Sequence, residues 1–329
     1  MPPAAHGAVR LLRDASDVDF EPSDLPAVPR PDRILMADPD FFQVDYVINP
    51  HMAGRLGTVD RRTALLEWDA LQAAYEGLGY RVDVLPAVPL LPDFVFTANQ
   101  CLPIPPGVVS PGPALVPSIM RASRRRAEVH HVVDHLAAQG LDVLRLNRRV
   151  VDCFEGMGDA AWLPGRALLL GGVGPRTSVA AYRAISAWTA LPVAILELTD
   201  PRFYHLDTCL SLLDERTAVV YPGAFAASSM RLLRRLVPNL IEVETDEALA
   251  FVCNGHCPDG RTFITPPGAP RTAAQVRAAG FEVLELPTHE FLKSGGSVYC
   301  MKLHWWGVRR EPIQQAATDV PSLDDDRKG

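Results

Sequence analysis

The sequence predicts an α/β protein in which five strand–helix–strand units form a closed ring around a central pocket. The chain of 329 residues is 48% hydrophobic and 22% charged, which is ordinary for a globular protein with a large core. A strand–helix–strand pattern recurs five times, and a polar segment follows each second strand. A doubly wound sheet is the alternative architecture for such a pattern.

The five units follow one another along the chain. We expect first strands at residues 33–39, 114–120, 166–172, 217–223 and 261–267. Helices should follow at 60–79, 121–140, 177–191, 228–238 and 271–280, where apolar residues recur at three- and four-residue steps. Second strands are expected at 80–86, 141–147, 192–198, 239–245 and 281–287. A ring would bring the polar segments to its centre, at 92–100, 152–159, 202–208, 246–256 and 288–300.

The two ends of the chain lack this pattern. Residues 1–31 are rich in Pro, Ala and Asp and are expected to form a disordered tail, and 309–329 a polar tail. Residues 32–308 should form one catalytic domain. The six cysteines are scattered, no signal peptide is evident, and no apolar run of roughly 18 residues occurs, so we expect a cytoplasmic protein without a membrane partner. A net charge of −7 argues against a nucleic-acid partner, and whether the chain forms a homo-oligomer stays open.

Two of the polar segments contain groups suited to covalent and acid–base chemistry. Cys300 follows the sequence SGGSVY, where the glycines allow the backbone to approach the thiol closely. His205 and Asp207 are two residues apart, so on a strand both side chains would point to the same face. A carboxylate beside an imidazole orients the ring and favours its charged form, which suits a general acid or base.

Other segments carry carboxylates and an amide. Glu155 and Asp159 flank two glycines, and Asp93 and Asn99 bracket the sequence FVFTA. Carboxylates gathered in one pocket bind a planar cation through forked, charge-assisted hydrogen bonds, and guanidinium is the biological group of that shape. We therefore expect these residues to bind a guanidino substrate.

Five separated motifs carry a family resemblance: PDFVFTAN, FEGMGD, FYHLDT, YPGAF and EFLKSGGSVYC. Together they resemble the guanidine-modifying superfamily, also called pentein or amidinotransferase-like proteins. The resemblance runs from about Arg33 to Leu303 and implies a five-fold pseudosymmetric α/β propeller. The sequences YVINPHM, FTAN, FYHLDTC, VYPGAF and EFLKSGG are most similar to the arginine dihydrolase branch, which converts arginine to ornithine, ammonia and carbon dioxide.

The resemblance implies roles for individual residues. Cys300 would be the nucleophile, His205 the general acid/base, and Glu155 a guanidinium ligand that assists nearby proton transfers. Asp207 and Asp93 would bind the same guanidinium from other sides. Asn49, in VINPHM, matches a substrate-contacting asparagine of the dihydrolase branch. Asn99 stands where deiminases usually have an acid, and this difference favours a dihydrolase.

The sequence also departs from that branch. Gln100 and Cys101 follow Asn99 where the branch usually reads FTANAG, and GGSVYC replaces GGAAKC. Where the branch tends to offer an arginine for the substrate carboxylate, this chain has Ile119 and Met120. Arg121 or Arg124 would have to serve instead, and Arg176 is another candidate. These departures leave the substrate open: dimethylarginine hydrolysis, arginine deimination and amidino transfer are alternatives, as is a catalytically silent arginine-binding protein.

No cofactor is predicted. His131 and His135 lie four residues apart without a third metal ligand, and Cys253, His256 and Cys257 form one cluster without a second ligand pair. We therefore predict no metal. The sequence GGVGPRT lacks the last glycine of a dinucleotide fingerprint, and no GK[ST] loop occurs, so no nucleotide is implied.

Overall fold

Five small sheets, each with its own helix, make up the computed structural model, which describes residues 8–308. In every unit two parallel strands are joined by a helix, as the repeat predicts. The first strands are β2 (Arg33–Ala37), β5 (Ala114–Pro117), β8 (Leu169–Val173), β11 (Thr217–Val220) and β13 (Thr262–Thr265). The second strands are β3 (Arg81–Leu85), β6 (Asp142–Val143), β9 (Pro192–Glu197), β12 (Asn239–Glu242) and β14 (Glu282–Glu285).

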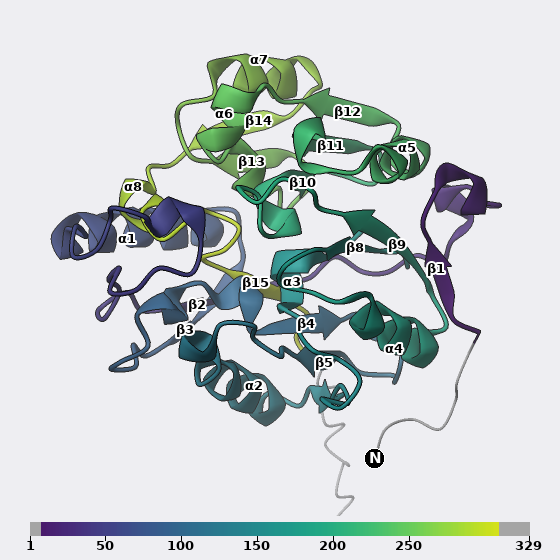
Figure 1. Cartoon of the computed structure of the whole chain (residues 1–329), viewed down its shortest axis with the longest axis horizontal. Coiled ribbons are helices and arrows are strands. Elements are labelled where there is room, and N and C mark those ends of the chain that lie inside the picture. Colours follow the sequence, from purple (N-terminus) through teal and green to yellow (C-terminus); the bar gives the residue numbers. More distant parts are fainter. Residues whose placement is uncertain (1–7, 309–329) are drawn as a thin grey trace, which may run out of the picture.

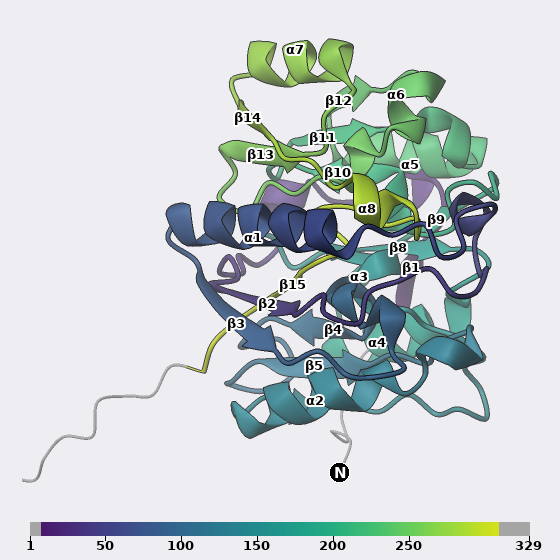
Figure 2. The same cartoon turned by 90° about the vertical axis from the view of Figure 1, so that its left-hand side faces the viewer.

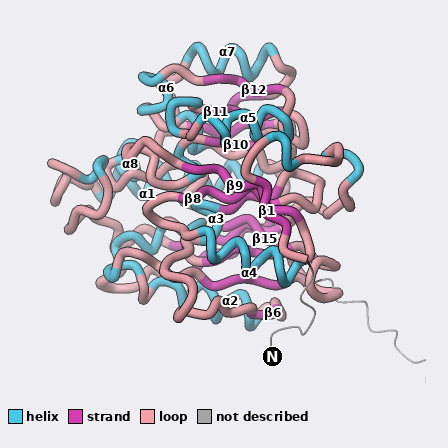
Figure 3. Tube along the Cα trace, turned by 45° about the vertical axis from the view of Figure 1, so that its right-hand side comes forward, coloured by secondary structure: helices cyan, strands magenta, loops and turns pink. Residues whose placement is uncertain are grey.

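The connecting helices lie on the outside of the molecule, around the sheets (Figures 1 and 3). They are α1 (Arg61–Gly77), α2 (Glu128–Ala138), α4 (Val179–Thr189), α5 (Ala227–Leu236) and α7 (Pro270–Ala278). Each buries one apolar stripe against its sheet, which is why the apolar residues recur at helical spacing. Gly79, Gly140 and Gly280 follow three of these helices with positive φ, the left-handed conformation that ends a helix at low cost.

A third strand adds antiparallel to the first strand of four units. These strands are β4 (Cys101–Ile104), β7 (Ala160–Trp162), β10 (Leu210–Leu212) and β15 (Leu303–Trp305). In the fifth unit a single antiparallel bridge joins His256 to Ile264. Because β15 comes from the C-terminal end of the described chain and pairs with β2, it connects the last unit to the first.

Residues 8–31 are not the disordered tail expected from the sequence. They form β1 (Arg10–Leu12), which pairs in parallel with the free edge of β9, and two short 3-10 helices, Ala15–Asp17 and Pro22–Asp24. Leu12 is buried in the core beneath this edge. A strand of three residues is too short to show a period of two, which explains why the sequence does not reveal it. Residues 1–7 and the expected tail at 309–329 lie outside the described residues.

Short helices occupy the polar segments that follow the second strands. Near the middle of the molecule lies α3 (Gly156–Asp159) (Figure 1). The 3-10 helices Thr97–Asn99 and Leu206–Thr208 contact α3, Val252–Asn254 contacts Leu206–Thr208, and Pro92–Val95 comes directly before Thr97–Asn99 in the chain. Beside α1 lies α8 (His289–Leu292), as the side view also shows (Figure 2). The remaining 3-10 helices are Pro50–Met52, Ser123–Arg125 and Pro222–Ala224. Within residues 8–308, none of the helices is both long and apolar enough to cross a membrane.

Candidate active site

His205 and Glu155 form a buried hydrogen-bonded pair near the middle of the molecule. Nε2 of His205 lies 2.8 Å from Oε2 of Glu155, and both side chains are buried. Each residue immediately precedes a short helix, His205 before Leu206–Thr208 and Glu155 before α3. The two short helices contact each other, and this contact brings the imidazole to the carboxylate.

The strand expected around His205 and Asp207 is absent. Residues 206–208 form a 3-10 turn, so the two side chains do not share the face of a strand. His205 pairs with Glu155, while Asp207 pairs with Cys300. The sequence interpretation of a His205–Asp207 pair is therefore wrong, because alternation of side chains requires extended backbone at every residue.

Glu155 is held as an anion by several donors. Its Oε1 accepts a hydrogen bond from the backbone N–H of Arg121 at 2.9 Å, and its Oε2 lies 3.1 Å from Nη1 of Arg176. Burial alone would raise the pKa of this carboxyl, but the hydrogen bond to His205 and the neighbouring positive charges lower it to about 2. A permanent buried negative charge is therefore available to a cationic group.

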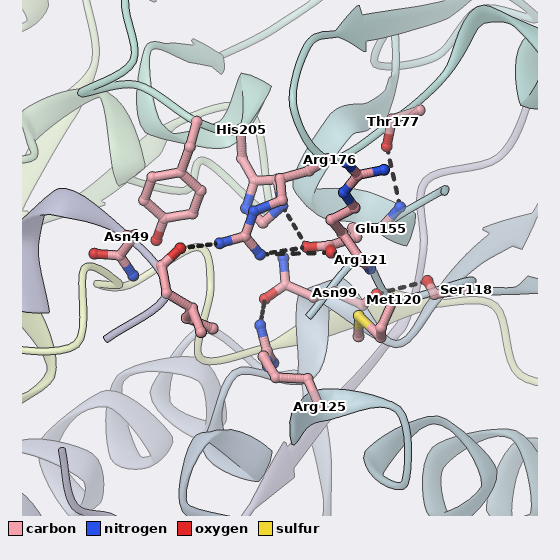
Figure 4. Close-up of polar contacts among 12 residues, drawn as sticks. Asn49, Asn99, Ser118, Met120, Arg121, Arg125, Glu155, Arg176, Thr177 and His205 are labelled. Carbon is pink, nitrogen blue, oxygen red and sulfur yellow. Dashed lines mark hydrogen bonds and ion pairs between the residues drawn. The ribbon is translucent and has the colours of Figure 1, made fainter. Parts of the chain in front are cut away.

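Arg176 already places a guanidinium against that charge. Its Nη1 binds Glu155 (Figure 4). Its Nη2 donates to the carbonyl of Ile48 at 2.7 Å, and its Cζ lies 5.1 Å from the centre of the Tyr204 ring. The surroundings of Glu155 thus provide the acceptors and the aromatic face that suit a planar cation. By contrast, the side chain of Arg121 is exposed, and only its backbone reaches Glu155.

Asp159 lies behind the imidazole. Its Oδ2 accepts a hydrogen bond from the hydroxyl of Thr177 at 2.6 Å and lies 4.0 Å from Nε2 of His205. Its Oδ1 accepts from the backbone N–H of Leu206 at 3.1 Å. Burial raises the pKa of Asp159 to about 6, against the opposing effects of His205 and Thr177. Both oxygens are engaged by neighbouring groups, and they tie α3 to the turn that carries His205.

Cys300 lies between Asp207 and Asn254. Its Sγ is 3.2 Å from Oδ2 of Asp207 and 3.2 Å from Nδ2 of Asn254. Burial raises the pKa of the thiol well above its ordinary value, and the charge of Asp207 adds to this, while the Asn254 hydrogen bond opposes it. Burial also raises the pKa of Asp207 to about 7. Without substrate, Cys300 is therefore a neutral thiol that donates a hydrogen bond to the carboxylate of Asp207.

Asn254 is a site residue that the sequence analysis missed. Besides contacting the thiol, its Oδ1 accepts the backbone N–H of Ser297 at 2.9 Å and its Nδ2 donates to the carbonyl of Asp207 at 2.9 Å. It thereby fixes the loop that carries Cys300. The repeat contains a signal for it, because Asn254 ends the 3-10 helix of one unit just as Asn99 ends that of another.

Asp93 and Asn49 form the opposite wall. The two oxygens of Asp93 accept hydrogen bonds from the hydroxyls of Ser294 and Tyr46, each at 2.7 Å. Asn49 donates from Nδ2 to the carbonyl of Ser294 at 2.9 Å, and its Oδ1 accepts the backbone N–H of His51 at 3.0 Å. This wall joins Asp93 and Asn49 through Ser294, which lies 201 and 245 positions further along the chain.

Asn99 is oriented by a buried arginine. Its Oδ1 lies 2.8 Å from Nη1 of Arg125, and because a guanidinium can only donate, the amide oxygen must face Arg125. The amide Nδ2 is buried and has no hydrogen-bond partner among residues 8–308. It lies so close to Gly158 that a Cβ there would be 2.4 Å from Nδ2 and 3.3 Å from Nδ1 of His205. A free donor therefore lies beside the imidazole.

Some of these groups enclose a small cavity, which His205, Glu155 and Asp207 do not line. Its volume is about 10 Å³, roughly the space for one water molecule. Five of the residues expected from the sequence line it: Asn49, Asp93, Asn99, Arg176 and Cys300. Within residues 8–308, no group of three His, Cys, Asp or Glu side chains is placed to hold a metal ion.

Comparison with known proteins agrees with this chemistry. The family model for N,N dimethylarginine dimethylhydrolase, eukaryotic, matches residues 49–305. The N(G),N(G)-dimethylarginine dimethylaminohydrolase of Mycobacterium tuberculosis is 38% identical over 275 residues, covering 84% of this chain and 86% of that protein. The bifunctional arginine dihydrolase/ornithine cyclodeaminase ArgZ of Synechocystis is 34% identical over 274 residues, which are 82% of this chain but only 37% of ArgZ.

A solved structure also resembles this chain. The substrate-bound N-terminal domain of ArgZ superimposes with a TM-score of 0.76 at 33% identity, covering 82% of this chain and 97% of that domain. The fold is the mixed α/β fold of these proteins. The protein is therefore a guanidino-group hydrolase, an enzyme that acts on C–N bonds of linear amidines. It belongs to the dimethylarginine dimethylaminohydrolase family, within the guanidine-modifying (pentein) superfamily.

Proposed function

We propose that this protein is an arginine dihydrolase, which converts L-arginine and two water molecules to ornithine, two ammonia and carbon dioxide. The observation that carries the proposal is the orientation of Asn99, whose amide N–H group has no partner in the described chain and lies beside His205. An acid at this position could only accept a hydrogen bond from a guanidinium. An amide N–H can instead donate to the carbonyl oxygen of a ureido group, the product of the first hydrolysis.

The first hydrolysis uses Cys300 as the nucleophile. Its thiolate forms a bond to the guanidinium carbon, held by Glu155 and Asp93, and the C–N bond to one terminal amine breaks. His205 donates the proton that allows this amine to leave as ammonia. Water then attacks the covalent amidino-thioether with His205 as the base, which breaks the S–C bond and yields the ureido compound.

A second round on the ureido carbon completes the reaction. Cys300 again forms a bond to carbon, the remaining terminal amine leaves as ammonia, and water releases the carbamate of ornithine, which loses carbon dioxide. The Nδ2 donor of Asn99 would stabilise the negative charge that develops on the ureido oxygen.

Substrate binding requires Arg176 to leave Glu155, because the two guanidinium groups would compete for the same carboxylate. Once displaced, Arg176 is available for the α-carboxylate of arginine, the role that Arg121 is less suited to because its side chain is exposed. Asn49, on the opposite wall, would contact the amino-acid end of the substrate. Asp159 would act through His205, whose turn it anchors.

The five units, we further propose, form a five-fold pseudosymmetric α/β propeller. Five separate sheets, each with a parallel pair joined by an outer helix, support this architecture. The pairing of β15 with β2, which joins the two ends of the repeat, supports closure. Such an arrangement would explain why the short helices of different units meet at the middle.

The proposal is tested by incubating the purified protein with L-arginine and identifying the products by mass spectrometry. We expect ornithine with two ammonia per arginine, and no product from the Cys300→Ala variant. The Asn99→Asp variant should stop at citrulline, because the carboxylate cannot donate to the ureido oxygen. Citrulline alone from the unaltered protein would contradict the proposal and indicate a deiminase. Turnover of dimethylarginine with none of arginine would identify a dimethylarginine hydrolase, and no turnover of either a binding protein.

A further inference from the structure

Lys302 is a completely buried lysine two residues beyond the thiol. Its side chain is 0% exposed, and its Nζ has no hydrogen-bond partner among residues 8–308. The ammonium lies 3.3 Å from the centre of the Tyr299 ring, a cation–π contact. An ammonium group without a hydrogen-bonded counter-ion in a protein interior costs several kcal/mol of folding free energy, so its presence calls for a physical explanation.

The groups around Lys302 come from several elements. Asp207, from the turn after His205, and Cys300 both favour the charged form of the lysine, although burial lowers its pKa to about 7. His256, at the bridge to β13, and His304, in β15, are near enough for the charge of Lys302 to act on them, and their ring centres lie 5.0 Å apart. Burial and the charge of Lys302 lower the pKa of both histidines well below the ordinary value, so both rings are neutral. Asp207 and Cys300 are therefore the groups near Lys302 that can carry negative charge.

We propose that Lys302 is a positioning residue whose positive charge allows the Cys300–Asp207 pair to hold a negative charge in this buried site. The inference rests on the proposed role of Cys300 as the nucleophile. The Sγ–H group lies 3.2 Å from Oδ2 of Asp207, so the proton can pass from sulfur to the carboxylate and leave a thiolate. The pair keeps one negative charge before and after this transfer, and Lys302 compensates it in both states.

The sign of the effect follows from this charge balance. Replacing Lys302 with methionine, which has a similar length and no charge, should raise the pH at which the thiolate forms. The same replacement leaves the negative charge of the pair without compensation, so it should lower the free energy of unfolding more at high pH, where the pair is charged, than at low pH. A purely structural role for the lysine predicts a loss of stability that is equal at every pH, with an unchanged pH profile of the thiol.

The test is the pH dependence of alkylation of Cys300 by iodoacetamide, followed by mass spectrometry of the labelled peptide, in the parent and the Lys302→Met variant. The Cys300→Ser variant measures labelling of the other five cysteines, all buried. We expect the midpoint to rise by at least one pH unit, so that labelling at pH 7 is at least about tenfold slower, with similar rates at high pH. An unchanged midpoint in a folded Lys302→Met protein would overturn the inference.

A second measurement needs no change at Lys302. The chain has only three lysines, Lys293, Lys302 and Lys328, so a sample labelled with 13C-lysine gives three side-chain NMR signals, with Lys293→Arg assigning one of them. We expect one signal to titrate near neutral pH and its midpoint to fall in Cys300→Ser and in Asp207→Asn, because coupling between charges is reciprocal. Three ordinary lysine titrations, or no response to either variant, would contradict the inference.

Neither measurement depends on turnover. If arginine is not hydrolysed but the alkylation and NMR results are as expected, the proposed function fails and the role of Lys302 remains. If arginine is hydrolysed and the midpoints do not move, the inference fails and the function remains.

Discussion

Glu155 and Asp207 are two carboxyl groups with similar burial whose pKa values are shifted in opposite directions. Glu155 accepts hydrogen bonds from His205, Arg176 and a backbone N–H, and its pKa is lowered to about 2. Asp207 accepts one hydrogen bond from a thiol on Oδ2, while Oδ1 is buried without a partner among residues 8–308. Burial raises its pKa to about 7.

The difference shows that partners, and not burial, decide the charge of each half of the site. Burial alone would raise the pKa of either residue, and only Glu155 has enough donors to reverse the effect. The His205 half therefore carries a fixed negative charge that can receive a guanidinium. The Cys300 half can exchange a proton near neutral pH, which suits the formation of a thiolate.

The largest expected effect is on the fixed charge. Glu155→Gln should lower kcat/KM for arginine by about 10³-fold or more, because the variant loses both the ligand of the guanidinium and the partner of His205. Steady-state kinetics by ammonia release would measure it. Glu247→Gln is the matched control, since Glu247 is a buried glutamate that binds Thr272 outside the cavity. A Glu155→Gln protein within tenfold of the parent would show that the fixed charge is not needed.

A smaller effect is expected when one partner of Glu155 is removed. Arg176→Met should raise KM for arginine by about 10–100-fold, the usual effect of losing a charge-assisted hydrogen bond to a carboxylate. The KM for agmatine, which is arginine without its carboxylate, should not rise, because the variant also frees Glu155 for the substrate. Competition binding of the two compounds to Cys300→Ala would report the same difference without turnover. Equal weakening for both compounds would mean that Arg176 does not bind the carboxylate.

The sequence was sufficient to predict the five units because apolar residues recur with different periods in strands and in helices. All five first strands, helices and second strands lie at the expected places in the chain, although α2 begins seven residues later than expected and β6 has only two residues. The structure also brings five of the expected site residues to one cavity, and His205 to Glu155. The repeat made this possible, because equivalent segments of a repeated unit are expected to meet.

Contacts between distant segments could not be predicted in the same way. Asn254 contacts Cys300, which is 46 positions away in the sequence, and Arg125 orients Asn99, which is 26 positions away. No local sequence pattern indicates either contact. The His205–Asp207 interpretation failed because a single 3-10 turn changes the direction of every side chain after it. Local periodicity reports the secondary structure, whereas the partner that sets the charge of a carboxylate depends on tertiary packing.

The smallest expected effect is on stability, where replacing Asp207 and replacing Glu155 should change the free energy of unfolding in opposite directions at high pH. The pKa of Asp207 is raised in the folded state, so its contribution to stability is complete below about pH 4 and is lost as pH rises through about 7. Asp207→Asn should therefore gain stability relative to the parent between pH 4.5 and 8, by on the order of 2–4 kcal/mol. Urea unfolding at both pH values measures this gain.

Glu155→Gln should behave in the opposite way. The pKa of Glu155 is lowered in the folded state, so its stabilisation is present above about pH 4 and is lost only as pH falls toward 2. The variant should be less stable than the parent at both pH 4.5 and 8, with little change between them. Only a carboxyl group that titrates between pH 4.5 and 8 can make the stability difference between variant and parent depend on pH. If Asp207→Asn lost the same stability at both pH values, Asp207 would be a permanent anion like Glu155.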